Sequence, residues 1–369
     1  MHLLKTPLNE RHKSLGGHMV PFAGWEMPVR YASIIEEYES VRKHSGIFDV
    51  SHMGELAVRG PGAKKFLDGL TCNRVSDLEN GQIHYNAVLN QAGGLVDDIT
   101  IYKISDDDYF VVSNASNYEK VYEYFIRLTP GDSEIVNESD LWNQIALQGP
   151  LAEKIFSEYT GIDFSDLNYY RFQDYEFLNE KIRVSRTGYT GEDGFEIYSS
   201  PGAGLKIWDG LLSAGKSSGI LPCGLASRDI LRLESMYALY GHELNEERTP
   251  VESGIGWIVK EKEIPYPQYE KIIEQKKKGP DYKVCPFILK ENGIPRENYD
   301  IYSENGDPIG KVLSGAHSPT LKKGIGTAYL PSDYFRAGTT VFIEIRNKKI
   351  SAEVTKGAFV KGTAGKKTK

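Results

Sequence analysis

Cysteine is scarce in this chain of 369 residues: Cys72, Cys223 and Cys285 stand far apart, in no spacing typical of metal ligands. An odd and scattered set of thiols provides no disulfide framework and no zinc motif, and it is typical of a reducing compartment. Long apolar runs are lacking too, because no stretch approaches the roughly 18 apolar residues of a membrane span and the first residues form no apolar signal core. We therefore expect a soluble intracellular protein that binds no metal.

Basic residues are outnumbered, with 44 Lys and Arg against 51 Asp and Glu and a formal net charge of −7. Proteins that bind nucleic acid usually carry a basic surface, so we expect no nucleic-acid partner. Neither G-x-x-x-x-G-K-[ST] nor a helix-opening G-x-G-x-x-G is present, which argues against a nucleotide cradle. Lysines gather at residues 276–278 and at Lys361, Lys366, Lys367 and Lys369, where a solvated loop and tail explain them.

The length allows two or three domains with cores of ordinary size. Up to Trp257, helical and strand patterns are mixed, whereas residues 260–283 read as a charged linker with a short helix. From Val284 onward, short strands broken by Gly, Asn and Pro predict a small β-barrel or sandwich. In the first part, helices are predicted over 8–15, 34–43, 61–70, 117–128, 151–159, 205–212 and 222–240. Strands are predicted over 81–89, 95–102, 107–112, 142–148 and within 183–198. A loop is predicted over 22–28.

Two adjacent carboxylates occupy the predicted strand over 95–102, directly after a turn over 90–94. Neighbouring side chains of a strand point to opposite faces, so Asp97 shares an apolar face and Asp98 a mixed, polar one. Burying Asp97 would be costly unless it is hydrogen-bonded or lies at the end of the strand. From these residues alone, a solvated or turn-capping pair and a functional pair both remain open.

Other candidate residues are ambiguous in the same way. The lone His52 could be a base, although a hydrogen-bonded structural histidine is the commoner case. The amides and hydroxyls of residues 113–117 could bind the polar edge of a ligand ring or only form a turn. Arg228 and Arg232 stand four residues apart on a predicted helix, where they could clamp a carboxylate or pair with two acidic neighbours on that helix.

Short motifs spread over nearly the whole chain point to one family when they are taken together. Each is weak alone, but in this order they resemble the glycine cleavage T-protein family, the aminomethyltransferases. The motifs are FAGWEMP (22–28), GIFDVSHMGE (46–55), GGLVDD (93–98), QGP (148–150), SRTGYTGEDGFE (185–196), GLASRDILRLE (224–234), YGHEL (240–244) and SGAHSPTLKKGIG (314–326).

The resemblance implies an α+β cloverleaf. Two interwoven folate-binding α/β subdomains would lie within residues 1–280, and a C-terminal β-barrel would occupy residues 281–369. It also implies that a lipoylated H protein presents an aminomethyl group on the sulfur of its dihydrolipoyl arm. The enzyme would move this one-carbon unit to tetrahydrofolate, giving 5,10-methylenetetrahydrofolate, ammonia and the reduced arm. A monomer is expected.

The site residues carried over from the family motifs centre on Asp98, the second aspartate of GGLVDD, as the catalytic residue, with Asp97 as its support. A fixed carboxylate would stabilise a cationic transition state and orient the pterin amines. Glu196 would bind the amino edge of the pterin, and Arg228 would lie near the folate. The remaining residues expected to line the slot are Tyr85, Asn114, Tyr189 and Tyr237.

The chain also departs from the family pattern. Residues 264–272, IPYPQYEKI, replace a common Phe-Ile-Gly turn, and the lysine-rich end after Phe359 leaves any terminal contact with the folate tail open. Because the family match begins at Thr6, no presequence is expected, which favours a bacterial cytoplasmic protein over a mature mitochondrial matrix chain.

Two other functions share this fold and stay open as alternatives. One is a tetrahydrofolate-dependent demethylase with another donor; related dehydrogenases carry a flavin domain that this chain lacks. The other is a non-catalytic folate-binding accessory protein. Relatives of that kind carry K-G-C-[YF]-x-G-Q-E, where this chain has PCGLASRD at 222–229.

Overall fold

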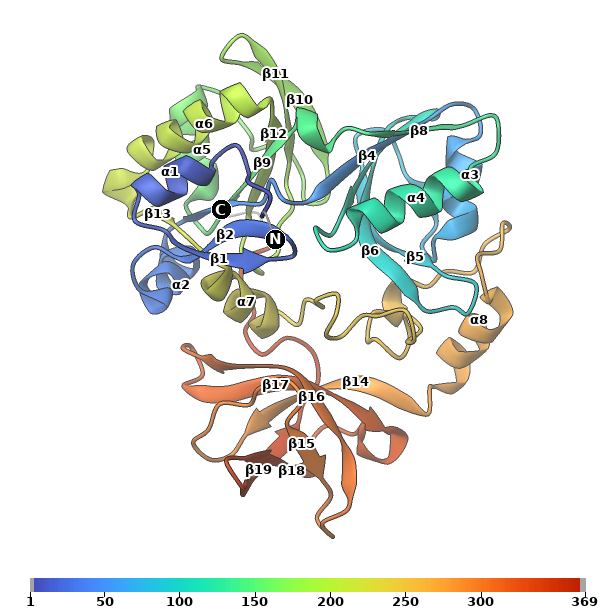
Figure 1. Ribbon diagram of the computed structural model, residues 1–369. Coiled ribbons are helices and arrows are strands. Elements are labelled where there is room, and N and C mark those ends of the chain that lie inside the picture. Colours follow the sequence, from blue (N-terminus) through green and yellow to red (C-terminus); the bar gives the residue numbers. More distant parts are fainter. Residues whose placement is uncertain (1–2, 366–369) are drawn as a thin grey trace.

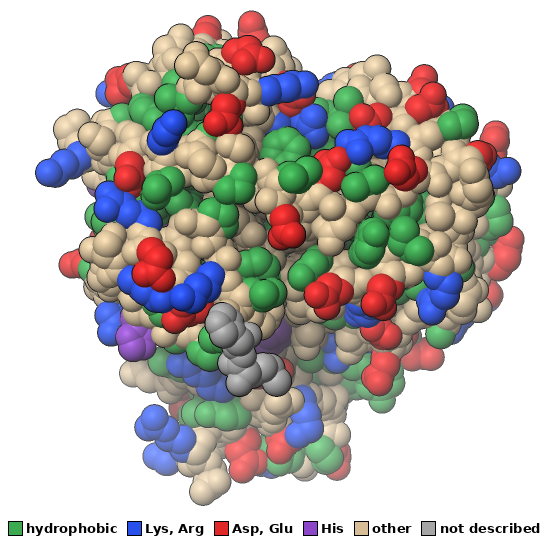
Figure 2. Space-filling view, turned by 45° about the horizontal axis from the view of Figure 1, so that its top comes forward, with side chains coloured by type: hydrophobic (Ala, Val, Ile, Leu, Met, Phe, Trp, Pro, Cys, Tyr) green, Lys and Arg blue, Asp and Glu red, His purple; other side chains and the backbone are tan. Residues whose placement is uncertain are grey.

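The computed structural model describes residues 3–365, so Lys366, Lys367 and Lys369 of the predicted tail lie outside the described residues. Figure 1 shows two upper lobes of mixed helix and sheet above a lower β-lobe, with α7 (Leu225–Glu234) between them. Among residues 3–365, no helix has the length and apolar character that a membrane crossing requires. On the face in Figure 2, acidic and basic side chains are interspersed.

One upper lobe is built on a five-stranded sheet in the order β5-β6-β7-β4-β8. Apolar side chains of α3 and α4 pack on it, with Leu67 and Phe125 fully buried against Val111 and Ile101. The elements are β4 (Gly54–Arg59), α3 (Ala63–Leu70), β5 (Ile83–Leu89), β6 (Leu95–Ser105), β7 (Asp108–Ser113), α4 (Tyr118–Leu128) and β8 (Glu134–Asn137).

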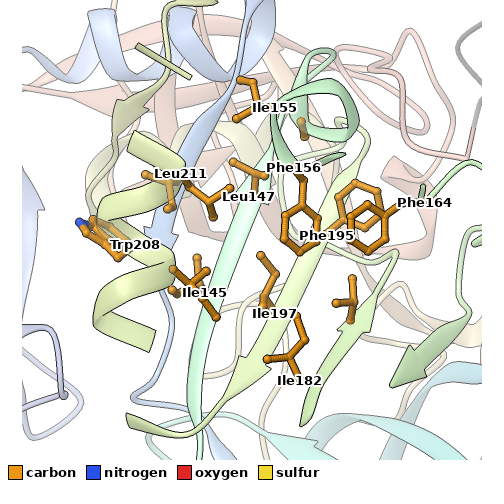
Figure 3. Close-up of a cluster of buried hydrophobic side chains, with 14 of the residues drawn as sticks. Ile145, Leu147, Ile155, Phe156, Phe164, Ile182, Phe195, Ile197, Trp208 and Leu211 are labelled. Carbon is orange, nitrogen blue, oxygen red and sulfur yellow. The ribbon is translucent and has the colours of Figure 1, made fainter. Parts of the chain in front are cut away.

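The other upper lobe has a six-stranded sheet in the order β10-β11-β12-β9-β3-β13. Its core, drawn in Figure 3, packs Trp208 and Leu211 of α6 and Phe156 of α5 against strand residues such as Ile145 and Leu147. The elements are β3 (Gly46–Asp49), β9 (Asn143–Gln148), α5 (Ala152–Thr160), β10 (Phe172–Phe177), β11 (Glu180–Ser185), β12 (Gly194–Ser199), α6 (Pro201–Ala214) and β13 (Leu221–Pro222).

The chain crosses between these lobes more than once. Strand β3 belongs to the six-stranded sheet, β4 to β8 build the five-stranded sheet, and β9 returns beside β3. The predicted interwoven α+β cloverleaf is therefore confirmed.

The lower lobe is a closed barrel in the order β14-β17-β16-β15-β18-β19, which confirms the predicted barrel. Its interior is filled by fully buried side chains such as Phe287, Val312 and Ile343. Its strands are β14 (Tyr282–Leu289), β15 (Asp300–Tyr302), β16 (Pro308–Ser318), β17 (Lys323–Pro331), β18 (Thr340–Ile345) and β19 (Lys348–Val354).

A hairpin near the amino terminus replaces the loop predicted over 22–28, which is wrong. Strands β1 (His18–Phe22) and β2 (Trp25–Arg30) pair across a two-residue turn, Ala23 and Gly24, with φ of 48° and 84°. Positive φ at both central residues matches the twist of a tight hairpin, so the turn closes the strands instead of separating them. The other elements are α1 (Asn9–Ser14), α2 (Ile34–Lys43), α8 (Tyr269–Lys278) and 3-10 turns at Val75–Asp77, Ser139–Leu141, Lys216–Ser218, Gly256–Ile258 and Ser332–Tyr334.

The helix predicted over 222–240 is too long, because α7 ends at Glu234. Met236 has a φ of 59°, which stops the helix, and the Arg232 guanidinium donates to the Tyr237 carbonyl oxygen at 3.2 Å. The following residues, 236–244, form a segment that we call the cavity loop. Residues of this loop line a central cavity, which is described below.

Candidate active site

A cavity of about 950 Å³ lies between the two upper lobes, α7 and the cavity loop. Strands β5 and β6 contribute to it from one lobe, and β12 with the loop before it from the other. All the site residues expected from the sequence line this cavity: Tyr85, Asp98, Asn114, Tyr189, Glu196, Arg228 and Tyr237. The fold thus places residues that are far apart in the chain around one cavity.

Asp97 is fully buried on β6 and has the hydrogen bonds that its position demands. One carboxylate oxygen accepts from the Asn114 backbone N–H at 2.9 Å, and the other accepts from the side-chain amides of Asn114 and Asn117 at 2.9 and 2.6 Å. Burial and the neighbouring Asp98 raise the pKa of Asp97 to about 8. The expectation that a buried Asp97 needs hydrogen bonds is confirmed, and these bonds fix the start of β6.

Asp98 points to the other side of β6 and faces the cavity. Its Oδ2 accepts from the Tyr85 hydroxyl at 2.9 Å, and its Oδ1 accepts from the Asn114 side-chain amide at 2.7 Å. Burial raises the pKa of Asp98 to about 6, while the Tyr85 and Asn114 hydrogen bonds act in the opposite direction. The wall of the cavity therefore holds a fixed carboxylate that is ionised at neutral pH.

Aromatic rings form opposing walls of the cavity. Tyr189 stacks with Tyr237 at a centroid distance of 5.8 Å and an angle of 28°, and the Arg228 guanidinium lies 4.8 Å from the Tyr189 centroid. Tyr85 stacks with Trp257 at 5.9 Å and 19°. Paired aromatic walls suit a flat heterocycle with polar edges. No pattern in the sequence indicates that Trp257 joins the site, because its stacking partner, Tyr85, lies far away in the chain.

The Glu196 end of the cavity contains both a carboxylate and unpaired polar atoms. Glu196 accepts from the Thr187 hydroxyl at 2.5 Å and from the Gln144 side-chain amide at 3.1 Å. Burial raises the pKa of Glu196, and the Thr187 hydrogen bond and the Arg228 charge oppose this. Gln144 Oε1 and Arg228 Nη1 are buried without a hydrogen-bond partner among the described residues. Buried polar groups normally have partners, so these atoms fit a bound ligand with donors and acceptors.

His52 also lines the cavity, although the sequence favoured a structural histidine that is fully hydrogen-bonded. That interpretation is wrong for Nδ1, which is buried without a partner among residues 3–365. The ring meets Phe22 edge to face at 5.7 Å. Burial lowers the pKa of His52 to about 4, so the imidazole is neutral at physiological pH.

Of the two alternatives left open for Arg228 and Arg232, the structure does not support a shared clamp on a ligand carboxylate. Arg232 is engaged in its own buried network, donating to Asp229 at 2.8 Å and to Glu243 at 3.0 Å. The alternative intrahelical network is right for Asp229 but not for Glu234, which accepts from side chains outside α7. Of these two arginines, Arg228 is the one whose Nη1 has no hydrogen-bond partner within residues 3–365.

Comparison with known proteins agrees with this architecture. Two family models match the chain, the GCVT N-terminal domain over residues 8–263 and the glycine cleavage T-protein C-terminal barrel domain over residues 283–361. A curated aminomethyltransferase from Leptospira biflexa serovar Patoc is 52% identical over 98% of this chain and 99% of that protein. Another from Halothermothrix orenii is 42% identical over 96% of this chain and 99% of that protein.

A solved structure shows the same fold over almost the full length. The crystal structure of glycine cleavage system aminomethyltransferase T from Bartonella henselae matches with a TM-score of 0.91 and 30% identity, covering 98% of this chain and 99% of that one. The chain therefore belongs to the glycine cleavage T-protein family, the aminomethyltransferases.

Proposed function

We propose that the central cavity binds tetrahydrofolate as the one-carbon acceptor and that a lipoylated H protein is the aminomethyl donor. The observation that carries the proposal is the position of the Asp98 carboxyl group, held by Tyr85 and Asn114 in the wall of an aromatic-lined cavity. The described residues that line the cavity all come from the region that we assign to folate binding, 1–280, and none comes from the barrel, which the structure describes up to residue 365.

The reaction needs placement and charge more than strong acid-base catalysis. The carbon of the donor lies between sulfur and nitrogen, and it becomes bonded to N5 and N10 of the folate. Its bonds to sulfur and nitrogen break, and the two protons lost from N5 and N10 appear on the thiol and on ammonia. Positive charge develops on the carbon as either group departs, and a preorganised carboxylate stabilises that charge.

The side chains around Asp98 divide the remaining tasks. Glu196 would accept from the amino edge of the pterin, and Arg228, with its unpaired Nη1, would donate to the folate. Tyr189 and Tyr237 would form the wall against the flat ring. Asn114 has a task beyond the ligand contact, because its amide group already holds both Asp97 and Asp98.

The test is formation of 5,10-methylenetetrahydrofolate from H protein loaded with the aminomethyl group, followed by its absorbance or by coupled oxidation. Transfer with release of ammonia supports the proposal. Transfer only from a methylated small-molecule donor would instead indicate a demethylase. Tight tetrahydrofolate binding without transfer from either donor would indicate an accessory protein.

The pH dependence of turnover should report the ionisation of Asp98. Because burial raises its pKa to about 6, the carboxylate is charged above that pH and neutral below it. We expect kcat to be level near neutral pH and to fall about tenfold per pH unit below about pH 6. Circular dichroism at each pH checks that the protein stays folded, and a level profile down to about pH 5 would contradict an ionised Asp98.

Removing the Tyr85 hydroxyl should raise the pKa of Asp98 and lower kcat, while the aromatic ring stays in the wall of the cavity. Tyr85→Phe keeps the ring that stacks on Trp257 but loses the hydrogen bond of 2.9 Å to Asp98. This bond lowers the pKa of Asp98, so the acidic limb of the pH profile should move up by about half a unit to one unit. At about pH 8, kcat should fall by roughly 3- to 10-fold.

The matched control is Tyr282→Phe, which removes a hydroxyl from an exposed barrel tyrosine. It should leave both kcat and the pH profile unchanged. If Tyr85→Phe moves neither quantity, the hydroxyl does not support Asp98 in the active enzyme.

A further inference from the structure

The cavity loop forms part of the wall of the site, and the backbone hydrogen bonds within it, from the N–H groups of residues 241–244, close only local turns. Residues 237–240 and His242 line the cavity. The loop includes the residue with positive φ, Met236, and contains no regular helix or strand of its own apart from an isolated bridge between Tyr240 and Leu244. These turns do not determine how the loop lies against the cavity, so its placement depends on contacts with its surroundings.

A buried ion pair holds the loop from inside. Arg232 and Glu243 are each only 2% exposed, and Arg232 Nη1 lies 3.0 Å from Glu243 Oε2. The same nitrogen donates to the Tyr237 carbonyl oxygen at 3.2 Å, and the same carboxylate oxygen accepts from the Leu239 N–H at 2.9 Å. The pair thus fixes both the beginning and the middle of the loop.

The barrel supplies the hydrogen bonds that the ion pair still needs. Ser314 Oγ of β16 accepts from Arg232 Nη2 at 2.9 Å, and the Thr327 hydroxyl of β17 donates to Glu243 Oε1. Both barrel residues are buried. A buried ion pair is stable only when its remaining donors and acceptors are satisfied, so the barrel completes this network.

The position of the loop determines the position of the aromatic wall. The Tyr189 hydroxyl donates to the Ala238 carbonyl oxygen, and the Tyr189 ring stacks on Tyr237. Further along, the Tyr240 hydroxyl donates to the Leu95 carbonyl oxygen at 3.0 Å, two residues before Asp97. A displaced loop would therefore move the ring that faces the ligand.

We propose that the C-terminal barrel shapes the folate slot through Thr327 and Ser314, which act on the cavity loop by way of the Arg232–Glu243 pair. These barrel residues are positioning residues, because neither of them lines the cavity and both act through Arg232 and Glu243. The inference rests on the proposed function, since the ligand of the slot is taken to be tetrahydrofolate. It gives the barrel a role in substrate binding in addition to packing.

The structure offers a matched comparison within the same interface. The Ser318 hydroxyl of β16 donates to Glu234 of α7, which also accepts from Arg42 at 2.6 Å and from Tyr38 at 2.6 Å. This second contact also joins a barrel hydroxyl to a buried carboxylate of the upper lobes. None of its hydrogen bonds reaches the cavity loop.

The experiment compares Thr327→Val and Ser318→Ala in the complete chain. For Thr327→Val, we expect the KM for tetrahydrofolate to rise about 5- to 20-fold, with kcat changed less than about twofold, because one buried hydrogen bond to a charged group is lost. Thr327→Ser should restore the KM. Ser318→Ala should lower the melting temperature but leave the KM unchanged.

Hydrogen–deuterium exchange provides a readout that does not depend on folate. Amides of residues 237–244 should exchange faster in Thr327→Val than in wild type or in Ser318→Ala. A folded Thr327→Val with unchanged KM and unchanged exchange would overturn the inference, and so would an equal rise of KM in Ser318→Ala. If Thr327→Val does not fold, Ser314→Ala takes its place with the same expected results.

The two proposals can fail separately. Failure of the wild-type protein to use tetrahydrofolate would overturn the proposed function, while the exchange data would still decide whether the barrel holds the loop. Wild-type turnover with unchanged loop exchange in both positioning variants would overturn only the role of the barrel.

Discussion

Asp98→Asn is expected to lower kcat by about 10²- to 10³-fold, because removing one preorganised electrostatic group typically has an effect of this size. The Kd for tetrahydrofolate should change less than about threefold. Asparagine has nearly the same size and keeps the local contacts. Its carbonyl oxygen can accept from the Asn114 amide, and its NH2 can donate to the Tyr85 oxygen, because a hydroxyl also accepts. What disappears is the negative charge, which in the proposed mechanism stabilises the cationic transition state and contributes little to folate binding.

Single-turnover kinetics with aminomethyl-loaded H protein would measure the rate of transfer, and calorimetric titration would measure the Kd. Asp107→Asn makes the same chemical change at an exposed position between β6 and β7 and should leave both quantities unchanged. Near-normal transfer by a folded Asp98→Asn protein would remove Asp98 from the mechanism.

The alternation of side chains along residues 95–102 was enough to separate the two aspartates. Asp97 is fully buried and Asp98 lines the cavity, as the strand pattern predicted. The pattern could not identify their partners, since Tyr85 lies on a neighbouring strand and Asn114 and Asn117 follow β7. Hydrogen bonds between distant segments depend on the register of the sheet, which a single strand does not encode.

The error over residues 222–240 occurs where tertiary contacts override a local pattern. Residues 222–240 contain no proline or glycine after Gly224 that would end a helix. The chain nevertheless leaves the helix at Met236, and Arg232 binds the freed Tyr237 carbonyl oxygen. A left-handed conformation at a residue other than glycine costs free energy, which the surrounding contacts must offset. Its site beside the cavity agrees with the tendency of such strain to occur at functional positions.

Arg232 shows why spacing alone cannot separate a ligand-binding residue from a structural one. Arg228 and Arg232 are four residues apart on α7, yet Arg228 has an unpaired Nη1 in the cavity and Arg232 is bonded to Asp229, Glu243 and Ser314. The difference is set by Glu243 and the barrel, which lie well beyond the helix in the sequence. Helical periodicity finds a shared face but not what that face contacts.

Glu196→Gln is expected to produce the opposite kinetic pattern to Asp98→Asn. The Kd for tetrahydrofolate should rise about 10- to 100-fold, which corresponds to about 1.4–2.8 kcal/mol, the range for one hydrogen-bonded charged group. A carboxylate can accept from two N–H groups of a pterin edge, whereas a carboxamide offers one acceptor and one donor and so leaves a ligand N–H unpaired. The hydrogen bonds of this side chain with Thr187 and Gln144 should persist. The Thr187 hydroxyl can accept from the new NH2, while the Gln144 amide still donates to the carbonyl oxygen.

At saturating tetrahydrofolate, the Glu196→Gln enzyme should keep kcat within about threefold of wild type, because Glu196 is proposed to bind the ligand and not to stabilise the transition state. Glu176→Gln, an exposed change on β10 of the same sheet, is the matched control for the loss of one negative charge. Kinetics would then distinguish the roles of the two carboxylates. Asp98→Asn lowers the rate at nearly constant affinity, and Glu196→Gln lowers the affinity at nearly constant rate. If Glu196→Gln instead lost kcat while binding folate normally, the roles assigned to Glu196 and Asp98 would have to be reconsidered together, since both assignments depend on the same orientation of the pterin between them.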